Sequence, residues 1–89
     1  MDFEISPDLD KELKKLKTHD KQLAQKIEKQ LSLFQLNHFH PSLRIHKLTG
    51  NLGNIWSISI DKNVRMLYVL DDDGAYFFDI GTHDQVYKK

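Results

Sequence analysis

The stretch Trp56-Ser57-Ile58-Ser59-Ile60-Asp61 decides the fold of this chain, because large apolar and polar residues alternate strictly along it. Alternation with a period of two is typical of a β-strand whose two faces meet different surroundings. We expect the Trp56 side of the strand to face a core, and the Ser57 and Ser59 side to face solvent or a ligand. The sequence on either side of this strand indicates what the sheet packs against.

Upstream of the strand, apolar residues recur at the spacing of two amphipathic helices. Ser6-Pro7-Asp8 is typical of a helix start, with a serine N-cap, a proline at the first helical position and an acid in the first turn. Asp20 can cap a second helix. The apolar stripes are Leu9, Leu13 and Leu16 in the first helix, and Leu23, Ile27, Leu31 and Phe34 in the second. Since only a few residues join the helices, they should form an antiparallel hairpin.

Short strands are expected on both sides of the helical hairpin. They cover Phe3–Ile5, Leu43–Leu48, Trp56–Ile60, Arg65–Leu70 and Tyr76–Ile80. The turns between them are expected at Gly50–Asn54, at Asp61–Asn63, where Asn63 tolerates a positive φ, and at Asp71–Gly74. We summarise the order as β–α–α–β–β–β plus a short C-terminal tail. This is an α+β fold with a small antiparallel sheet packed against the helical hairpin, in which the first and second strands run in opposite directions.

Length and composition indicate one domain over residues 1–89. Hydrophobic residues make up 39% and charged residues 29%, which is typical of a soluble globular protein. There is no cysteine, no apolar run of about 18 residues and no signal peptide pattern, so we expect a cytoplasmic protein without membrane contact. The formal net charge is +0, so a polyanionic partner would have to meet a local basic patch.

Candidate functional residues gather around the segment Asp79-Ile80-Gly81-Thr82-His83-Asp84-Gln85-Val86-Tyr87. A short helical turn after Gly81 would place His83 and Tyr87 side by side, because residues i and i+4 share a helix face. Two further candidates lie upstream, His46 beside Lys47 and Arg65 at a hairpin. Histidine can transfer protons near neutral pH, and arginine presents a planar fork of donors that suits phosphate.

The chain resembles the RelE/ParE superfamily of toxins from type II toxin–antitoxin modules, and within it the RelE and YafQ-like mRNA interferases. The resemblance covers nearly the whole chain. It rests on the order of elements and on three motif regions: His46-Lys47-Leu48-Thr49-Gly50, Ile55–Ile60 with Arg65-Met66-Leu67-Tyr68, and Asp79–Tyr87. It implies a cytoplasmic toxin that cleaves mRNA in the ribosomal A site without a metal or other cofactor, and that a cognate antitoxin neutralises.

The resemblance also implies roles for four residues. His83 and His46 lie where the YafQ-like branch carries histidines, and Arg65 matches a phosphate-contacting arginine of the RelE branch. Tyr87 lies where the superfamily often carries a functional aromatic residue. Metal-free RNA cleavage uses the 2′-hydroxyl as nucleophile and needs a base, an acid and a cation for the phosphorane charge. The sequence leaves open which histidine is base and which is acid.

Structural alternatives remain open for these residues. His83 could be a turn histidine, Tyr87 could pack the end of the chain, and Arg65 could pair with Asp61 on the surface. A zinc site is disfavoured because the histidine spacing matches no closed motif.

Alternatives also remain for the function. The chain is neutral where ribosome-acting relatives are usually basic, and its middle strand carries serines where the YafQ-like branch has a further histidine and acid. The functional alternatives are therefore a ParE-like DNA gyrase inhibitor without catalysis and a non-toxic, partner-binding relative.

Overall fold

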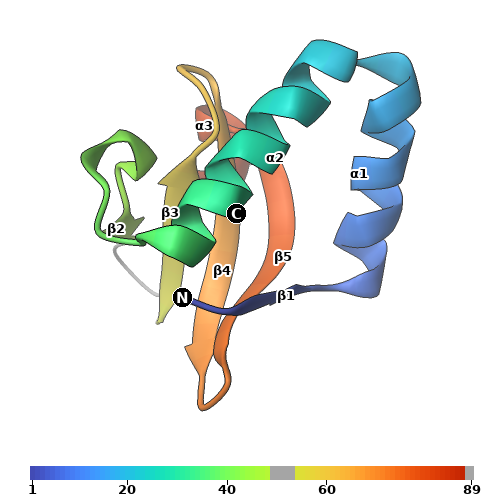
Figure 1. Ribbon diagram of the computed structural model, residues 1–89. Helices are drawn as coiled ribbons and strands as arrows, with labels where there is room; N and C mark the ends of the chain where they lie inside the picture. The colour runs from blue at the N-terminus through green and yellow to red at the C-terminus, as the bar shows by residue number, and fades with distance from the viewer. Residues whose placement is uncertain (49–53, 88–89) are drawn as a thin grey trace.

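The computed structural model describes residues 1–48 and 54–87, and it confirms an α+β fold (Figure 1). Its elements are β1 (Phe3–Ile5), α1 (Pro7–His19), α2 (Lys21–Leu36), the 3-10 helix η1 (Pro41–Leu43), β2 (His46–Lys47), β3 (Ile55–Ser59), β4 (Val64–Asp71), β5 (Gly74–Thr82) and α3 (His83–Tyr87). The structure has four strands after the helical hairpin, which agrees with the four predicted segments but not with the summarised order, which counted three. No described helix has the length and apolar character needed to cross a membrane.

The strands form one five-stranded sheet in the order β1-β5-β4-β3-β2. Neighbours from β2 to β5 are antiparallel, but β1 runs parallel to β5, with Phe3 opposite Ala75. The predicted antiparallel sheet is therefore confirmed for β2 to β5, and β1 at the edge is the exception. The first and second strands do run in opposite directions, as expected, but they lie at opposite edges of the sheet.

The helical hairpin begins and turns at the residues that the sequence indicated. The Ser6 hydroxyl accepts a hydrogen bond from the Leu9 amide at 3.2 Å, and the Asp20 carboxylate accepts one from the Leu23 amide at 3.1 Å. Asp20 ends α1 and caps α2, so a single residue joins the two helices. These side chains satisfy amide groups that the first turn of a helix leaves without partners.

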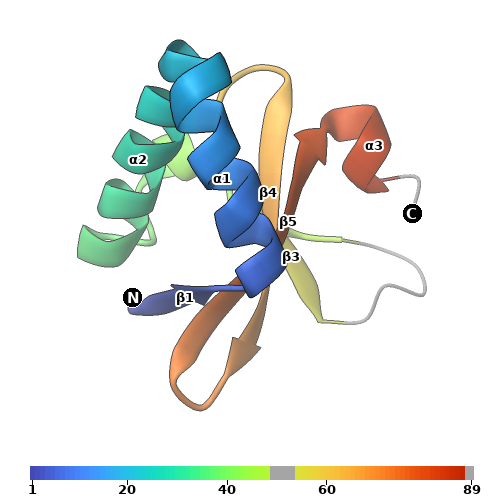
Figure 2. The ribbon, with the colours of Figure 1, turned by 90° about the vertical axis from the view of Figure 1, so that its right-hand side faces the viewer.

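The sheet has two covered faces (Figure 2). The helical hairpin covers one face over a core that includes Phe34 and Phe77, both fully buried. The short helix α3 covers part of the other face, where Val86 is fully buried against Leu48 and Leu67. The second layer explains why the apolar strands β4 and β5 lack a clean alternation.

The serine face of β3 differs from its prediction. Ser57 is fully buried and Ser59 is 9% exposed, because the side chain of Arg65 and the elements around it cover this face. Trp56 packs against the core as expected, although it is only half-buried at the rim of the helix-covered face.

The predicted strand Leu43–Leu48 is shorter than expected. Leu43 ends η1 and is fully buried, and only His46–Lys47 pair with β3. Arg44 causes the break, since its φ of 45° and ψ of 49° lie in the left-handed region, which is incompatible with a strand. Within the described residues Arg44 is the only non-glycine residue with a positive φ, so Asn63 does not adopt the positive φ that it could tolerate. Most of the predicted turn Gly50–Asn54 lies outside the described residues.

Candidate active site

Arg65 is the centre of the candidate site and is only 9% exposed. It lies in β4, directly opposite Ser59 of β3 and Gly81 of β5. Its Nε donates a hydrogen bond to the Ser57 hydroxyl at 3.0 Å, and its Nη2 donates to the Arg44 carbonyl at 2.7 Å. Two fixed donors hold the guanidinium plane in one orientation, which a lysine ammonium could not reproduce.

The left-handed conformation of Arg44 presents its carbonyl to two side chains at once. This oxygen accepts from Arg65 Nη2 and also lies 3.2 Å from Nδ1 of His46. A non-glycine residue in this region costs about 1 kcal/mol or more, and such strain is concentrated at functional sites. The carbonyl oxygen of Arg44 therefore contacts both Arg65 and His46.

The pKa of His46 lies below its ordinary value of 6.5. Desolvation by partial burial is the largest cause, and the positive charge of Arg65, whose Nη2 lies 3.4 Å from Nδ1, is the next. The hydrogen bond to the Arg44 carbonyl opposes these effects, and His83 adds a smaller lowering. The lowered pKa favours the neutral imidazole, and Nδ1 carries the proton if it donates to the Arg44 carbonyl.

A capping box starts α3 and fixes the position of His83. The Thr82 hydroxyl accepts from the Gln85 amide at 3.2 Å, and the Gln85 side chain accepts from the Thr82 amide at 2.9 Å. His83 is the first residue of the helix, and its amide donates to the Asn63 carbonyl at 3.1 Å. Its ring is 66% exposed, with Nδ1 3.8 Å from the Asp84 carboxylate.

Gly81 allows α3 to fold back onto the sheet. A Cβ on this residue would come within 2.9 Å of Gln85 Oε1 and 3.3 Å of Val86 Cγ1, so a larger residue would push the helix away. Tyr87 ends α3 one turn after His83, as the spacing predicted. The side chain of Tyr87 lies outside the described part of the structure.

The structure brings His46, Arg65 and His83 to the same face of the sheet; we call these three residues the candidate active site. His46 pairs with Ser57 across β2 and β3, and Ser57 binds Arg65. Asp61, the surface partner that the sequence allowed for Arg65, pairs with Lys26. Within residues 1–48 and 54–87, no group of three or more His, Cys, Asp or Glu side chains is arranged to hold a metal ion.

Three supporting features were missed from the sequence. The Thr82–Gln85 capping box has a recognisable signature, a threonine followed three residues later by a glutamine, which could have been read. The anchoring of Arg65 by Ser57, and the shared Arg44 carbonyl, depend on contacts between strands and a strained backbone, for which the sequence carries no local signal.

Comparison with known proteins identifies the family. A family model described as "Bacterial toxin of type II toxin-antitoxin system, YafQ" matches residues 1–88. The chain belongs to the YafQ family of toxins. The resemblance inferred from the sequence motifs is therefore confirmed, and this YafQ-family chain is a toxin of a type II toxin–antitoxin system.

Individual relatives agree with this assignment. A protein of Methanocaldococcus jannaschii that carries the name toxin RelE4 is 31% identical over 90 residues, which cover 99% of this chain and 92% of the relative. A solved YoeB–YefM complex from Staphylococcus aureus matches with a TM-score of 0.73 at 23% identity, over 93% of this chain and 97% of that chain. A DinJ–YafQ complex from E. coli matches with a TM-score of 0.73 at 20% identity, over 97% of each chain. These structural matches show that the YafQ-family chain shares its fold with YoeB and YafQ toxins.

Proposed function

We propose that this YafQ-family toxin is a metal-independent endoribonuclease that acts as one toxin domain over residues 1–89. Its substrate is mRNA in the ribosomal A site, and cleavage inhibits translation in the cytoplasm. The observation that carries the proposal is that His46, with its lowered pKa, the fixed Arg65 and a second histidine, His83, lie on one face of the sheet. These are the groups that RNA cleavage by the substrate's own 2′-hydroxyl requires.

His46 is the general base in this mechanism. With Nδ1–H donating to the Arg44 carbonyl, the lone pair of the imidazole is on Nε2, which can accept the 2′-hydroxyl proton. The 2′-oxygen then attacks the adjacent phosphorus, and the bond from phosphorus to the 5′-oxygen breaks. The products are a 2′,3′-cyclic phosphate and a 5′-hydroxyl.

Arg65 and His83 complete the reaction. The guanidinium of Arg65 is held in place before substrate arrives, so it can stabilise the developing phosphorane charge without reorganisation. His83 lies at the exposed start of α3 and donates a proton to the departing 5′-oxygen. Tyr87, one helical turn away, is assigned to stacking on a base or assisting proton transfer.

An antitoxin is the second proposed partner. The solved complexes YoeB–YefM and DinJ–YafQ have the fold of this chain, which supports a cognate antitoxin here. An antitoxin would neutralise the toxin by covering the candidate active site or the surface that meets the ribosome.

The test is cleavage of a defined mRNA on purified, programmed ribosomes, mapped by primer extension. The wild-type protein should cut in the A-site codon, and an mRNA with a single 2′-deoxynucleotide at the cut site should resist. His46→Ala and His83→Ala should each lower the rate by about 10²–10⁴-fold, the usual contribution of a general acid or base. His19→Ala is the matched control, because His19 is exposed in the last turn of α1 and should leave the rate unchanged.

Two results would overturn the proposal. Arrest of translation with intact mRNA would show a toxin that binds without cleaving. Arrest of DNA synthesis that is insensitive to His83→Ala would instead favour a ParE-like gyrase inhibitor.

A further inference from the structure

A second concentration of positive charge lies next to the candidate active site. A cleft of about 420 Å³ opens between α2, η1 and the β3–β4 hairpin. Four exposed basic side chains line it, Lys26, Lys29, Arg44 and Lys62, and we call it the cationic cleft. Arg65 forms part of its wall, so the cleft and the candidate active site share one residue.

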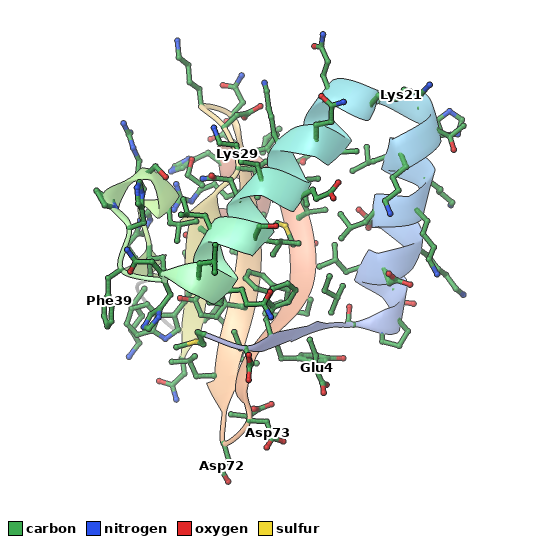
Figure 3. All side chains as sticks on the ribbon, in the orientation of Figure 1. Glu4, Lys21, Lys29, Phe39, Asp72 and Asp73 are labelled. Atoms are coloured by element: carbon green, nitrogen blue, oxygen red, sulfur yellow. The ribbon has the colours of Figure 1, made fainter. Side chains whose placement is uncertain are left out.

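The charge of the cleft contrasts with the neutrality of the chain, which carries 13 basic and 13 acidic residues. Asp61 is the single acid among the residues that line the cleft. The compensating acids lie elsewhere, and Figure 3 shows Asp72 and Asp73 at the tip of the β4–β5 turn, well away from Lys29 on α2. The cleft is therefore locally basic, although the whole chain is neutral.

Asp61 offsets only the charge of Lys26, because the backbone of the hairpin holds its carboxylate in place. Asp61 accepts hydrogen bonds from the amides of Asn63 at 2.8 Å and Val64 at 2.9 Å, and it pairs with Lys26 at 3.3 Å. These contacts, led by the Asn63 amide, hold the pKa of Asp61 below its ordinary value. Lys29, Arg44 and Lys62 form no ion pair with any residue in 1–48 or 54–87.

A rigid floor supports the cleft. The side chain of Gln30 is 7% exposed, and its Nε2 donates to the Ser59 carbonyl at 2.8 Å and the Ser42 carbonyl at 3.3 Å. One buried amide thereby ties α2 to both β3 and η1. The basic side chains consequently stand on a fixed frame rather than on independent loops.

We propose that the cationic cleft binds a phosphodiester group of an RNA strand, beside the phosphate that reacts at the candidate active site. The cleft leads directly to Arg65, so one strand can contact both places. An acidic peptide fits less well, because Ile60 is the one large apolar side chain among the lining residues and a peptide needs apolar anchors. This inference rests on the proposed function, since it takes RNA as the substrate.

The test measures RNA binding separately from cleavage. The probe is a fluorescent single-stranded RNA with 2′-O-methyl sugars, which can be bound but not cut. Lys29→Gln combined with Lys62→Gln removes two cleft charges without touching the candidate active site. Lys11→Gln combined with Lys15→Gln is the matched control, with the same charge change on exposed positions of α1.

The cleft variant should bind the RNA more weakly, and the slope of log affinity against log salt should become shallower by roughly 1.4, about 0.7 for each lost phosphate contact. The control variant should keep the wild-type slope. Equal slopes for the cleft variant and the wild type would overturn the proposal. So would an unchanged RNA affinity together with weakened binding of the antitoxin.

Two further measurements show whether the bound strand is mRNA or ribosomal RNA, and whether RNA binding by the cleft holds independently of mRNA cleavage. If the strand is mRNA, the cleft variant loses affinity for programmed ribosomes only, whereas ribosomal RNA would give an equal loss on empty ribosomes. If the wild type binds RNA through the cleft but cuts no mRNA, the proposed nuclease function is wrong and the proposed RNA binding by the cleft is still supported.

Discussion

Nη2 of Arg65 lies 3.4 Å from Nδ1 of His46, so a permanent cation faces a titratable ring. Burial is the larger cause of the lowered pKa of His46, and Arg65 is the next. Removing the cation should therefore return the pKa part of the way toward 6.5. We predict that Arg65→Gln raises the pKa of His46, as measured by NMR titration of its ring protons. An unchanged or lower pKa would contradict this assignment of cause.

The same pKa makes stability depend on pH. Between the lowered pKa of folded His46 and the ordinary value of 6.5, the unfolded chain binds more protons at this residue than the folded chain. The free energy of unfolding should thus rise with pH through this window, and the contribution of neutral His46 is lost as the pH falls. Urea denaturation of the wild type and His46→Gln at several pH values measures it. The wild type should lose stability relative to the variant as the pH drops below 6.5.

The strain at Arg44 predicts a difference between two substitutions. Arg44→Gly and Arg44→Ala both remove the side chain, but only glycine adopts a φ of 45° without a steric cost. Arg44→Gly should be more stable than Arg44→Ala by about 1 kcal/mol. Chemical denaturation of the two proteins gives the comparison directly. Equal stabilities would mean that the backbone near residue 44 relaxes in the variants.

The attachment of α3 predicts a loss of activity without a change in any proposed catalytic residue. Val86 is fully buried against Leu48 and Leu67, and replacing it by alanine removes about two methyl groups, or roughly 1.5–2 kcal/mol of packing. Val86→Ala should loosen α3, speed amide exchange in Thr82–Tyr87, and lower the cleavage rate because His83 is less well positioned. Amide exchange that stays slow while activity falls would point to a different cause.

Core packing predicts a contrast between two phenylalanines. Phe34 is fully buried and contacts Phe77 and Tyr68 edge-on, with ring centroids 5.3 Å away in each case. Phe34→Ala should cost about 3–5 kcal/mol, a large part of the stability of a small domain. Phe39 is 82% exposed, and Phe39→Ala should change stability by no more than about 0.5 kcal/mol. Thermal unfolding of both variants tests the pair.

Local chemistry explains which parts of the fold could be predicted. The caps at Ser6 and Asp20 act within three residues, and the helical stripes and the β3 alternation are also short-range patterns. The parallel pairing of Phe3 with Ala75 joins distant segments without a turn, so no local pattern announces it. The expected strand does not begin at Leu43, because the backbone at Arg44 is left-handed and the alternation of side chains does not reveal this.

The candidate active site also has features that the sequence predicted and features that it did not. Its residue types were visible, and the turn after Gly81 correctly predicted where α3 and His83 lie. The contacts that tune the site were not visible, because Ser57, Arg44 and Arg65 come from three separate elements. The roles of His46, Arg65, His83 and Tyr87 stay predictions until the variants are measured.

The pairing of β1 with β5 also governs the order in which this molecule can be made. During translation β1, α1 and α2 are made first. The strand that pairs with β1 is β5, which contains the core residue Phe77 and is made near the end. Domains fold as units, so the core closes only after β5 emerges, and His83 follows it. An interrupted nascent chain therefore lacks both the folded core and one proposed catalytic group, and would be harmless to the ribosome that produced it.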